Sequence, residues 1–172
     1  VLFRSKRRFG LDYCYDKECI VTVGGSEAID LAFRAIINPG DEVILLQPSY
    51  VAYTPGVALA GGKVVNIELK EDNEFKLTPE LLEAAITPKT KAILLNYPSN
   101  PTGGFMTRED YEKIVSIIKK HEIIVITDEI YAELSYEQKF CSIAAFDEIK
   151  DQVILVSGYS KAYISSVITI IS

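Results

Sequence analysis

Short apolar segments alternate with longer segments of helical periodicity, and this alternation constrains the fold more than any other feature of the sequence. From about residue 20 onward, Gly, Pro, Asn or Asp marks each change. The expected strands are rich in β-branched residues, as buried strands between helices are. They are Ile20–Val23, Glu42–Leu46, Lys63–Ile67, Ala92–Asn96, Ile123–Thr127 and Val153–Val156. Because helices connect them, the sequence predicts a three-layer α/β/α fold with a mostly parallel sheet.

Three helices are expected from the residues at their ends. Thr78 and Thr107 precede two of them as N-caps, and Pro79 takes a first helical position. The expected ranges are Glu27–Ile37, Pro79–Ile86 and Arg108–His121. In a parallel sheet connected in this way, ligands bind at the carboxyl ends of the strands.

Composition excludes several classes of function. The net charge of -6 and the lack of a Lys/Arg stripe argue against nucleic acid as a partner. No apolar run approaches the roughly 20 residues of a membrane span. The three cysteines have no CxxC pair, so we expect reduced thiols, no metal site and a cytoplasmic setting. The one histidine, His121, ends a predicted helix, where a dipole contact is a simpler interpretation than catalysis.

Two motifs at strand ends suit the binding of a flat anionic ligand. In GGSEAID, the turn Gly24-Gly25-Ser26 leads directly into a helix, whose free N–H groups can bind an anion. Its plainer interpretation is a glycine turn with Ser26 as N-cap. In QPSYVAY, Tyr50 can stack on a planar ligand, although Tyr50 and Tyr53 could equally be aromatics packed at a helix start. Neither GxGxxG nor GxxxxGK[ST] occurs.

Three further motifs follow later strands. LNYPSNPTGG forms a rigid loop that presents Asn96, Asn100 and Thr102, or else a plain turn. In VITDEIY, Asp128 ends a buried strand, where a carboxylate needs a cationic partner unless it caps the following turn. In VSGYSKAY, Lys161 is either a site residue or an exposed lysine at a helix start. An anion cradle, an aromatic platform, an Asn, an Asp and a single Lys together suit a phosphorylated pyridine aldehyde.

From about Phe9 to Tyr163 the chain resembles the class I/II aminotransferases, fold type I enzymes that use pyridoxal 5'-phosphate (PLP). The motifs that carry the resemblance are GGSEAIDLA, NPGDEV, QPSYVAY, TKAILLNYPSNPTG, TDEIYAEL and GYSKAY. The resemblance implies that Lys161 binds PLP covalently and moves the proton at the substrate α-carbon. It also implies that Asp128 pairs with the pyridine nitrogen and that Asn100 and Tyr131 bind the phenolic oxygen of the ring.

The resemblance implies further contacts. Tyr50 would stack on the ring, while Ser160, Gly25, Ser26 and the backbone N–H of Glu27 would bind the phosphate. It suggests cis peptide bonds before Pro48 and Pro101. The implied substrates are an amino acid and a 2-oxo acid, and the implied assembly is a homodimer.

The sequence also departs from the family. The arginine that in the family grips the PLP phosphate is replaced by Thr169. We therefore expect residues 1–8 to be an artefact or a disordered end, 9–163 a partial PLP-binding large domain, and 164–172 an aberrant tail. The chain alone is expected to be an inactive fragment. Three alternatives stay open: a PLP-dependent carbon-sulfur lyase, a non-catalytic PLP-fold module of a regulator, and a nicotinamide-binding domain.

Overall fold

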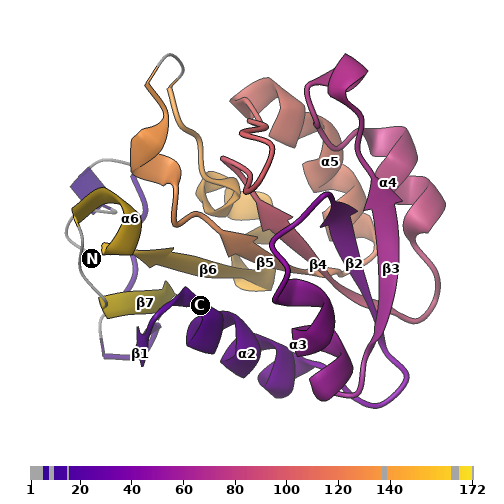
Figure 1. Ribbon diagram of the computed structural model, residues 1–172, viewed down its shortest axis with the longest axis horizontal. Helices are drawn as coiled ribbons and strands as arrows, with labels where there is room; N and C mark the ends of the chain where they lie inside the picture. The colour runs from indigo at the N-terminus through magenta and orange to yellow at the C-terminus, as the bar shows by residue number, and fades with distance from the viewer. Residues whose placement is uncertain (1–5, 8–9, 15, 137–138, 164–166, 172) are drawn as a thin grey trace.

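The computed structural model describes residues 6–7, 10–14, 16–136, 139–163 and 167–171. In this part of the chain, seven strands form one sheet in the order β1-β7-β6-β5-β4-β2-β3 (Figure 1). They are β1 (Cys19–Val23), β2 (Glu42–Gln47), β3 (Lys63–Glu68), β4 (Thr90–Asn96), β5 (Ile124–Asp128), β6 (Val153–Gly158) and β7 (Val167–Ile171). The predicted α/β fold is confirmed, and the expected strands are found with ends shifted by at most two residues.

The sheet is parallel except at one place. Strands β2 to β6 pair in parallel, whereas β7 runs antiparallel between β1 and β6. Strand β7 is not predicted and lies in the segment expected to be an aberrant tail. Of the two predicted end segments, residues 1–5, 8, 164–166 and 172 lie outside the described residues.

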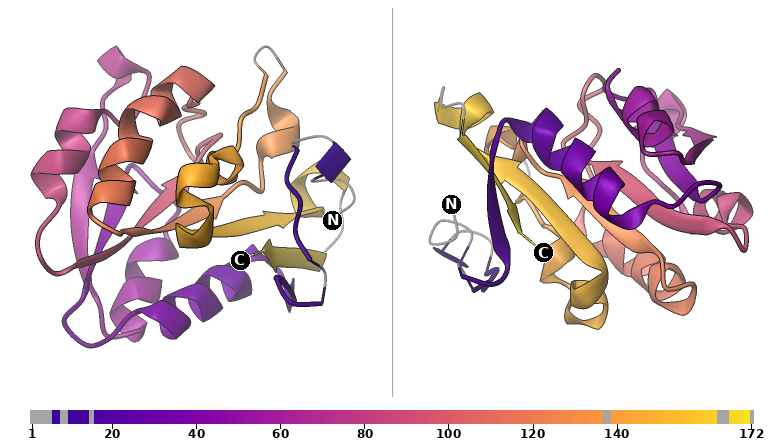
Figure 2. Two further views of the ribbon diagram at one scale, coloured as in Figure 1. Left: turned by 180° about the vertical axis from the view of Figure 1, so that it is seen from behind. Right: turned by 90° about the horizontal axis from the view of Figure 1, so that it is seen from below.

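Helices cover both faces of the sheet (Figure 2). They are α2 (Gly25–Ile36), α3 (Tyr53–Leu59), α4 (Pro79–Ala85), α5 (Arg108–Lys120) and the short α6 (Ser160–Tyr163). Short 3-10 turns occur at η1 (Glu71–Asn73), η2 (Ala132–Leu134), η3 (Ile143–Ala145) and η4 (Asp147–Gln152). The predicted N-caps are confirmed, because the side chains of Thr78 and Thr107 accept hydrogen bonds from Leu81 N–H and Asp110 N–H at 3.4 and 3.2 Å.

Two apolar cores lie on opposite faces of the sheet, because the side chains of each strand alternate between the two faces. Along β4, Ala92 and Leu94 pack with α2 and α3, while Ile93 and Leu95 pack in the core that contains α4 and α5. Successive side chains of a strand point to opposite faces. The same period places Asn96, the last residue of β4, on the side of α2 and α3.

No range is expected for helix α3, although a helix start near Tyr53 is one interpretation of the sequence; Pro55 and Gly56 interrupt its pattern. In the structure, Gly56 lies against the fully buried ring of Phe33 on α2. A Cβ at position 56 would lie 3.1 Å from two carbons of that ring. This glycine therefore allows α3 to approach α2 closely, and the approach fixes where the residues before and within α3 lie.

The described residues contain no helix that is both long and apolar enough to cross a membrane. Nor do they contain a group of three or more His, Cys, Asp or Glu side chains that could hold a metal ion. His121 is the C-cap of α5, as expected, and its Nε2 lies 3.3 Å from the Oε1 of Glu83.

Candidate functional site

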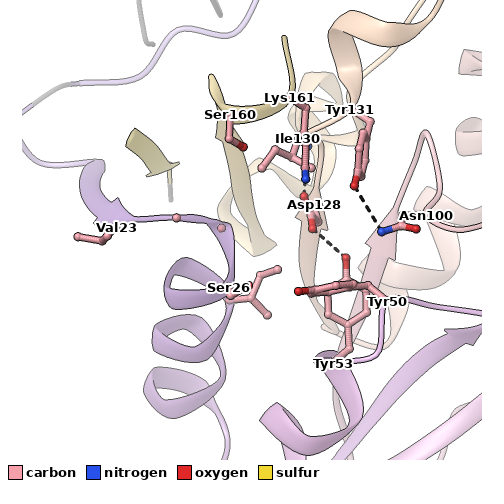
Figure 3. Close-up of a pocket in the computed structure, with 13 residues that line it drawn as sticks. Val23, Ser26, Tyr50, Tyr53, Asn100, Asp128, Ile130, Tyr131, Ser160 and Lys161 are labelled. Atoms are coloured by element: carbon pink, nitrogen blue, oxygen red, sulfur yellow. Dashed lines mark hydrogen bonds between the residues drawn. The ribbon is translucent and has the colours of Figure 1, made fainter. Parts of the chain in front are cut away.

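A cavity of about 350 Å³ opens where the carboxyl ends of β5 and β6 meet the beginning of α2 (Figure 3). With the exception of Glu27, all of the predicted site residues line it. These are Gly25, Ser26, Tyr50, Asn100, Asp128, Tyr131, Ser160 and Lys161. Val23, Gly24, Ile29, Tyr53 and Ile130 complete the lining. The fold thus brings five motifs that are far apart in the sequence to one place.

Asp128 lies at the centre of this cavity and is 7% exposed. Its Oδ2 accepts a 2.8 Å hydrogen bond from the hydroxyl of Tyr53, and its Oδ1 accepts one of 3.1 Å from Ile130 N–H. Burial raises the pKa of Asp128, while these two hydrogen bonds and the charge of Lys161 lower it; the net direction is upward. Asp128 therefore both caps the following turn and presents a carboxyl group that a cation would stabilise.

Lys161 extends from α6 toward Asp128 (Figure 3). Its Nζ lies 5.7 Å from the centre of the Tyr131 ring, a distance at which a cation and an aromatic face attract each other. The sequence alone leaves open an ordinary lysine at a helix start. In the structure Lys161 is an exposed residue, yet it lines the same cavity as a buried carboxyl group.

Asn100 and Tyr131 reach the cavity from the segments that follow β4 and β5. The Nδ2 of Asn100 donates to the hydroxyl of Tyr131 at 3.3 Å. The expected cis peptide bonds at Gln47–Pro48 and Asn100–Pro101 are confirmed, and Tyr97–Pro98 is a third. Thr102 does not reach the cavity; its hydroxyl accepts from Gly104 N–H within the same loop.

Tyr50 lines the cavity and is 38% exposed. Its ring meets that of Tyr53 edge to face, with centroids 5.5 Å apart and planes at 77°. Tyr53 is itself buried at the start of α3, so the packed-aromatic interpretation is right for Tyr53. For Tyr50 the structure leaves a ring face beside the cavity.

The beginning of α2 offers backbone N–H groups to the cavity. The first hydrogen bond within the helix runs from Ala28 N–H to Gly24 C=O at 3.3 Å, so Gly25, Ser26 and Glu27 precede it. Gly24 has φ of 93°, a conformation that favours glycine. The interpretation of Ser26 as N-cap is wrong, because Gly24 occupies that position and no side chain caps the helix.

The carboxylate of Glu27 is engaged in a hydrogen bond at the helix start and not in ligand binding. That carboxylate accepts a hydrogen bond from Val23 N–H, at the residue just before the turn. It thereby stabilises the start of α2, as an acidic residue in a first helical turn does. Only the backbone N–H of Glu27 stays available for the predicted anion contact.

The prediction from the sequence omitted two residues that hold the site together. Tyr53 holds Asp128, and Asn96 donates to the Asp128 carbonyl at 2.9 Å while accepting from Asn100 N–H at 2.8 Å. Both occur in the motifs that were singled out, Tyr53 three residues after Tyr50 and Asn96 at a strand end. Nothing local in the sequence indicates their partners.

The comparisons with known proteins agree on one family. Residues 3–166 match the family described as aminotransferase class I and II. The putative aminotransferase YugH of Bacillus subtilis is 51% identical over 156 residues, which are 91% of this chain and 40% of that protein. An aspartate aminotransferase of Geobacillus stearothermophilus is 41% identical, with 95% and 42% covered.

Solved structures show the same likeness. The aromatic aminotransferase from Pyrococcus horikoshii OT3 superposes with a TM-score of 0.95 at 32% identity, covering 99% of this chain and 47% of that one. N-succinyldiaminopimelate aminotransferase from Mycobacterium tuberculosis gives 0.94 at 34% identity, with 99% and 46% covered. The chain spans about 40% of the length of the curated relatives it matches.

Proposed function

The chain belongs to the class I and II aminotransferases, and from this premise we propose that it builds the PLP site of an enzyme that transfers an amino group. The donor is an amino acid and the acceptor a 2-oxo acid. One observation carries the proposal: Lys161, Asp128 and the beginning of α2 face a single cavity. A lysine, a buried carboxyl group and an anion-binding helix end are the three groups that a phosphorylated pyridine aldehyde requires.

The residues present fit this cofactor, and Asp128 is the clearest test. Both of its oxygens have donors from the protein, yet burial still raises its pKa. A buried carboxyl group in this condition gains from a cationic partner. In the proposal, Asp128 holds the proton on the pyridine nitrogen, and Tyr53 and Ile130 N–H keep the carboxylate oriented toward it. When bound, PLP withdraws electrons from the α-carbon of the attached amino acid.

Lys161 carries out the proton transfer in this proposal. It would hold the cofactor through its amine, and the same amine, when free, would move a proton at the α-carbon of the substrate. The attraction between Nζ and the Tyr131 ring, with 5.7 Å between them, keeps the amine beside the cavity. Asn100 and Tyr131 bind the phenolic oxygen of the cofactor, and their mutual hydrogen bond orients both.

The remaining proposed contacts are with the ring and with the phosphate of the cofactor. Tyr50 packs against the ring. Ser160 and the N–H groups of Gly25, Ser26 and Glu27 hold the phosphate, supported by the partial positive charge at the start of a helix.

The proposal extends to the assembly and the setting. Two apolar side chains at the cavity are strongly exposed: Val23, which lines it, is 84% exposed, and Val51, next to Tyr50, is 83% exposed. Such a surface is typical of an interface, which supports a homodimer. All three cysteines are free thiols, which supports the cytoplasmic setting expected from the sequence.

Reductive labelling tests the proposed cofactor site. The purified chain is incubated with PLP, reduced with borohydride and digested for mass spectrometry. We expect PLP fixed on Lys161, no labelling at that position in Lys161→Ala, and unchanged labelling in the control Lys89→Ala. Labelling spread evenly over surface lysines, or no labelling, would contradict the proposal.

Product analysis tests the reaction. The chain is supplied with PLP, an amino acid such as aspartate and a 2-oxo acid. A new amino acid with the matching oxo acid supports transfer, whereas pyruvate and ammonia from a sulfur amino acid support the lyase alternative. The expectation that this chain alone is inactive predicts PLP binding without either product.

A further inference from the structure

Asn96 joins the backbones of two residues of the proposed PLP site. The side chain is 8% exposed and uses both ends of its amide. Its Nδ2 donates to the carbonyl of Asp128 at 2.9 Å, and its Oδ1 accepts from the backbone N–H of Asn100 at 2.8 Å. Asn96 is not among the residues that line the cavity, so it touches the site only through its neighbours.

The strand pairing explains why a side chain is needed at this point. Asn96 and Asp128 are the last paired residues of β4 and β5. Beyond them the register between β4 and β5 ends, whereas Glu129 N–H still pairs with Val156 on β6 at 2.9 Å. The Asn96 amide therefore supplies a connection between β4 and β5 at the edge where their backbone ladder ends.

The two residues connected by Asn96 have different tasks. Asp128 presents its carboxyl group from one wall, and Asn100 presents its amide toward Tyr131 from the other. With Asn96 between them, the loop that carries Asn100 cannot move relative to β5 without breaking a buried hydrogen bond. A neutral side chain of this size with one donor and one acceptor is required, and asparagine supplies both.

We propose that Asn96 is a positioning residue that sets the separation of Asn100 and Asp128, and thereby the fit of the site to PLP. The proposal rests on the proposed function. A purely structural role for Asn96 predicts a loss of stability alone. A positioning role predicts a loss of PLP affinity in protein that is still folded.

The test measures the dissociation constant of PLP by absorbance titration, and separately the melting temperature of the chain without PLP. Asn96→Leu removes both hydrogen bonds, and we expect PLP to bind about tenfold more weakly or worse. The matched control is Asn66→Leu on β3, an exposed residue whose amide oxygen accepts from the Gln47 side chain at 3.1 Å. In the control, PLP affinity is expected to stay at the wild-type value.

Asn96→Asp distinguishes the donor role of the amide from its acceptor role. It also serves as the test if Asn96→Leu does not fold. The new carboxyl keeps the acceptor for Asn100 N–H but, when ionised, faces the Asp128 carbonyl without a donor. Burial raises the pKa of such a group, so lowering the pH from about 8 to about 5 protonates it and restores a donor. We expect its PLP affinity, relative to wild type at each pH, to recover as the pH falls.

A double-mutant comparison identifies the route. If Asn96 acts partly through Asn100, the loss caused by Asn96→Leu is at least about threefold smaller in an Asn100→Ala background. An equal loss in both backgrounds, or unchanged PLP affinity in folded Asn96→Leu and Asn96→Asp, overturns the inference while leaving the proposed function intact. A wild-type chain that binds no PLP overturns both.

Discussion

The hydroxyl of Tyr53 donates a 2.8 Å hydrogen bond to the Oδ2 of Asp128, across 75 positions of the sequence. Tyr53 begins α3, and Asp128 ends β5. Both are buried. Burial, and after it the charge and hydrogen bond of Asp128, raise the pKa of Tyr53, while the same hydrogen bond lowers the pKa of Asp128 against the larger effect of burial. Tyr53 thus keeps the ionised form of a buried carboxyl group accessible in the fold.

Replacing Tyr53 by Phe tests this relationship. The loss of the hydroxyl leaves an Asp128 oxygen without its donor, so we expect a loss of about 1 to 3 kcal/mol in the free energy of unfolding near neutral pH. The loss should shrink in acid, where Asp128 is protonated and needs a donor less. Urea unfolding at several pH values measures it, and a loss that is the same at every pH would contradict this account.

Glu129 predicts a pH dependence of stability. Burial raises its pKa to about 8, although Ser142 and Thr127 donate to its Oε1 at 2.7 and 3.1 Å. The folded protein therefore holds this proton more tightly than the unfolded chain does. Its contribution to stability is present below the unfolded pKa of about 4.3 and is lost as the pH rises through the folded value of about 8.

Glu129→Gln should remove this part of the pH dependence, because the amide oxygen still accepts both hydroxyl bonds and carries no charge. We expect the variant to gain on wild type by a few kcal/mol between about pH 5 and about pH 9. The comparison uses urea unfolding at each pH, with exposed Glu148→Gln as control. Parallel curves for wild type and Glu129→Gln would show that Glu129 does not titrate in this range.

Gly56 predicts an effect of close packing. The Cβ of an alanine at this position would lie 3.1 Å from the fully buried Phe33 ring, so the ring would have to shift by a few tenths of an ångström. We expect Gly56→Ala to cost about 1 to 3 kcal/mol despite the better helix propensity of alanine. Combined with Phe33→Leu, the added methyl group should cost less than it does alone, as thermal unfolding of the four proteins would reveal. If the effects of Gly56→Ala and Phe33→Leu simply add, the cost of the added methyl group does not come from contact with Phe33.

The two predicted N-caps should differ in strength. Thr107 and Asp110 form a reciprocal capping box at the start of α5, whereas Thr78 makes a single 3.4 Å bond at the start of α4. We expect Thr107→Ala to cost about 1 to 2 kcal/mol and Thr78→Ala about 0.5 kcal/mol. Urea unfolding of both variants measures the difference, and the reverse order would argue against the capping box as the cause.

Much of the fold could be predicted because its signals are local. The apolar run before Asn96 and the Thr-Pro pair at residues 78 and 79 specify a strand and a helix start through nearest neighbours alone. The residues expected at the cavity could be found in the same way, since each follows a strand and parallel strands end at one edge of a sheet. Their roles toward PLP stay predictions.

The sequence by itself determined six of the seven strands and the helices α2, α4 and α5, and which side chains follow the strand ends. Only the tertiary structure decided that β7 enters antiparallel between β1 and β6, that Tyr53 reaches Asp128, and that Asn96 joins Asp128 to Asn100. The physical reason is the distance along the chain over which each signal acts. Periodicity and capping act over a few residues, whereas these contacts depend on the strand order and on which face each side chain takes, and the packing of the whole sheet sets both.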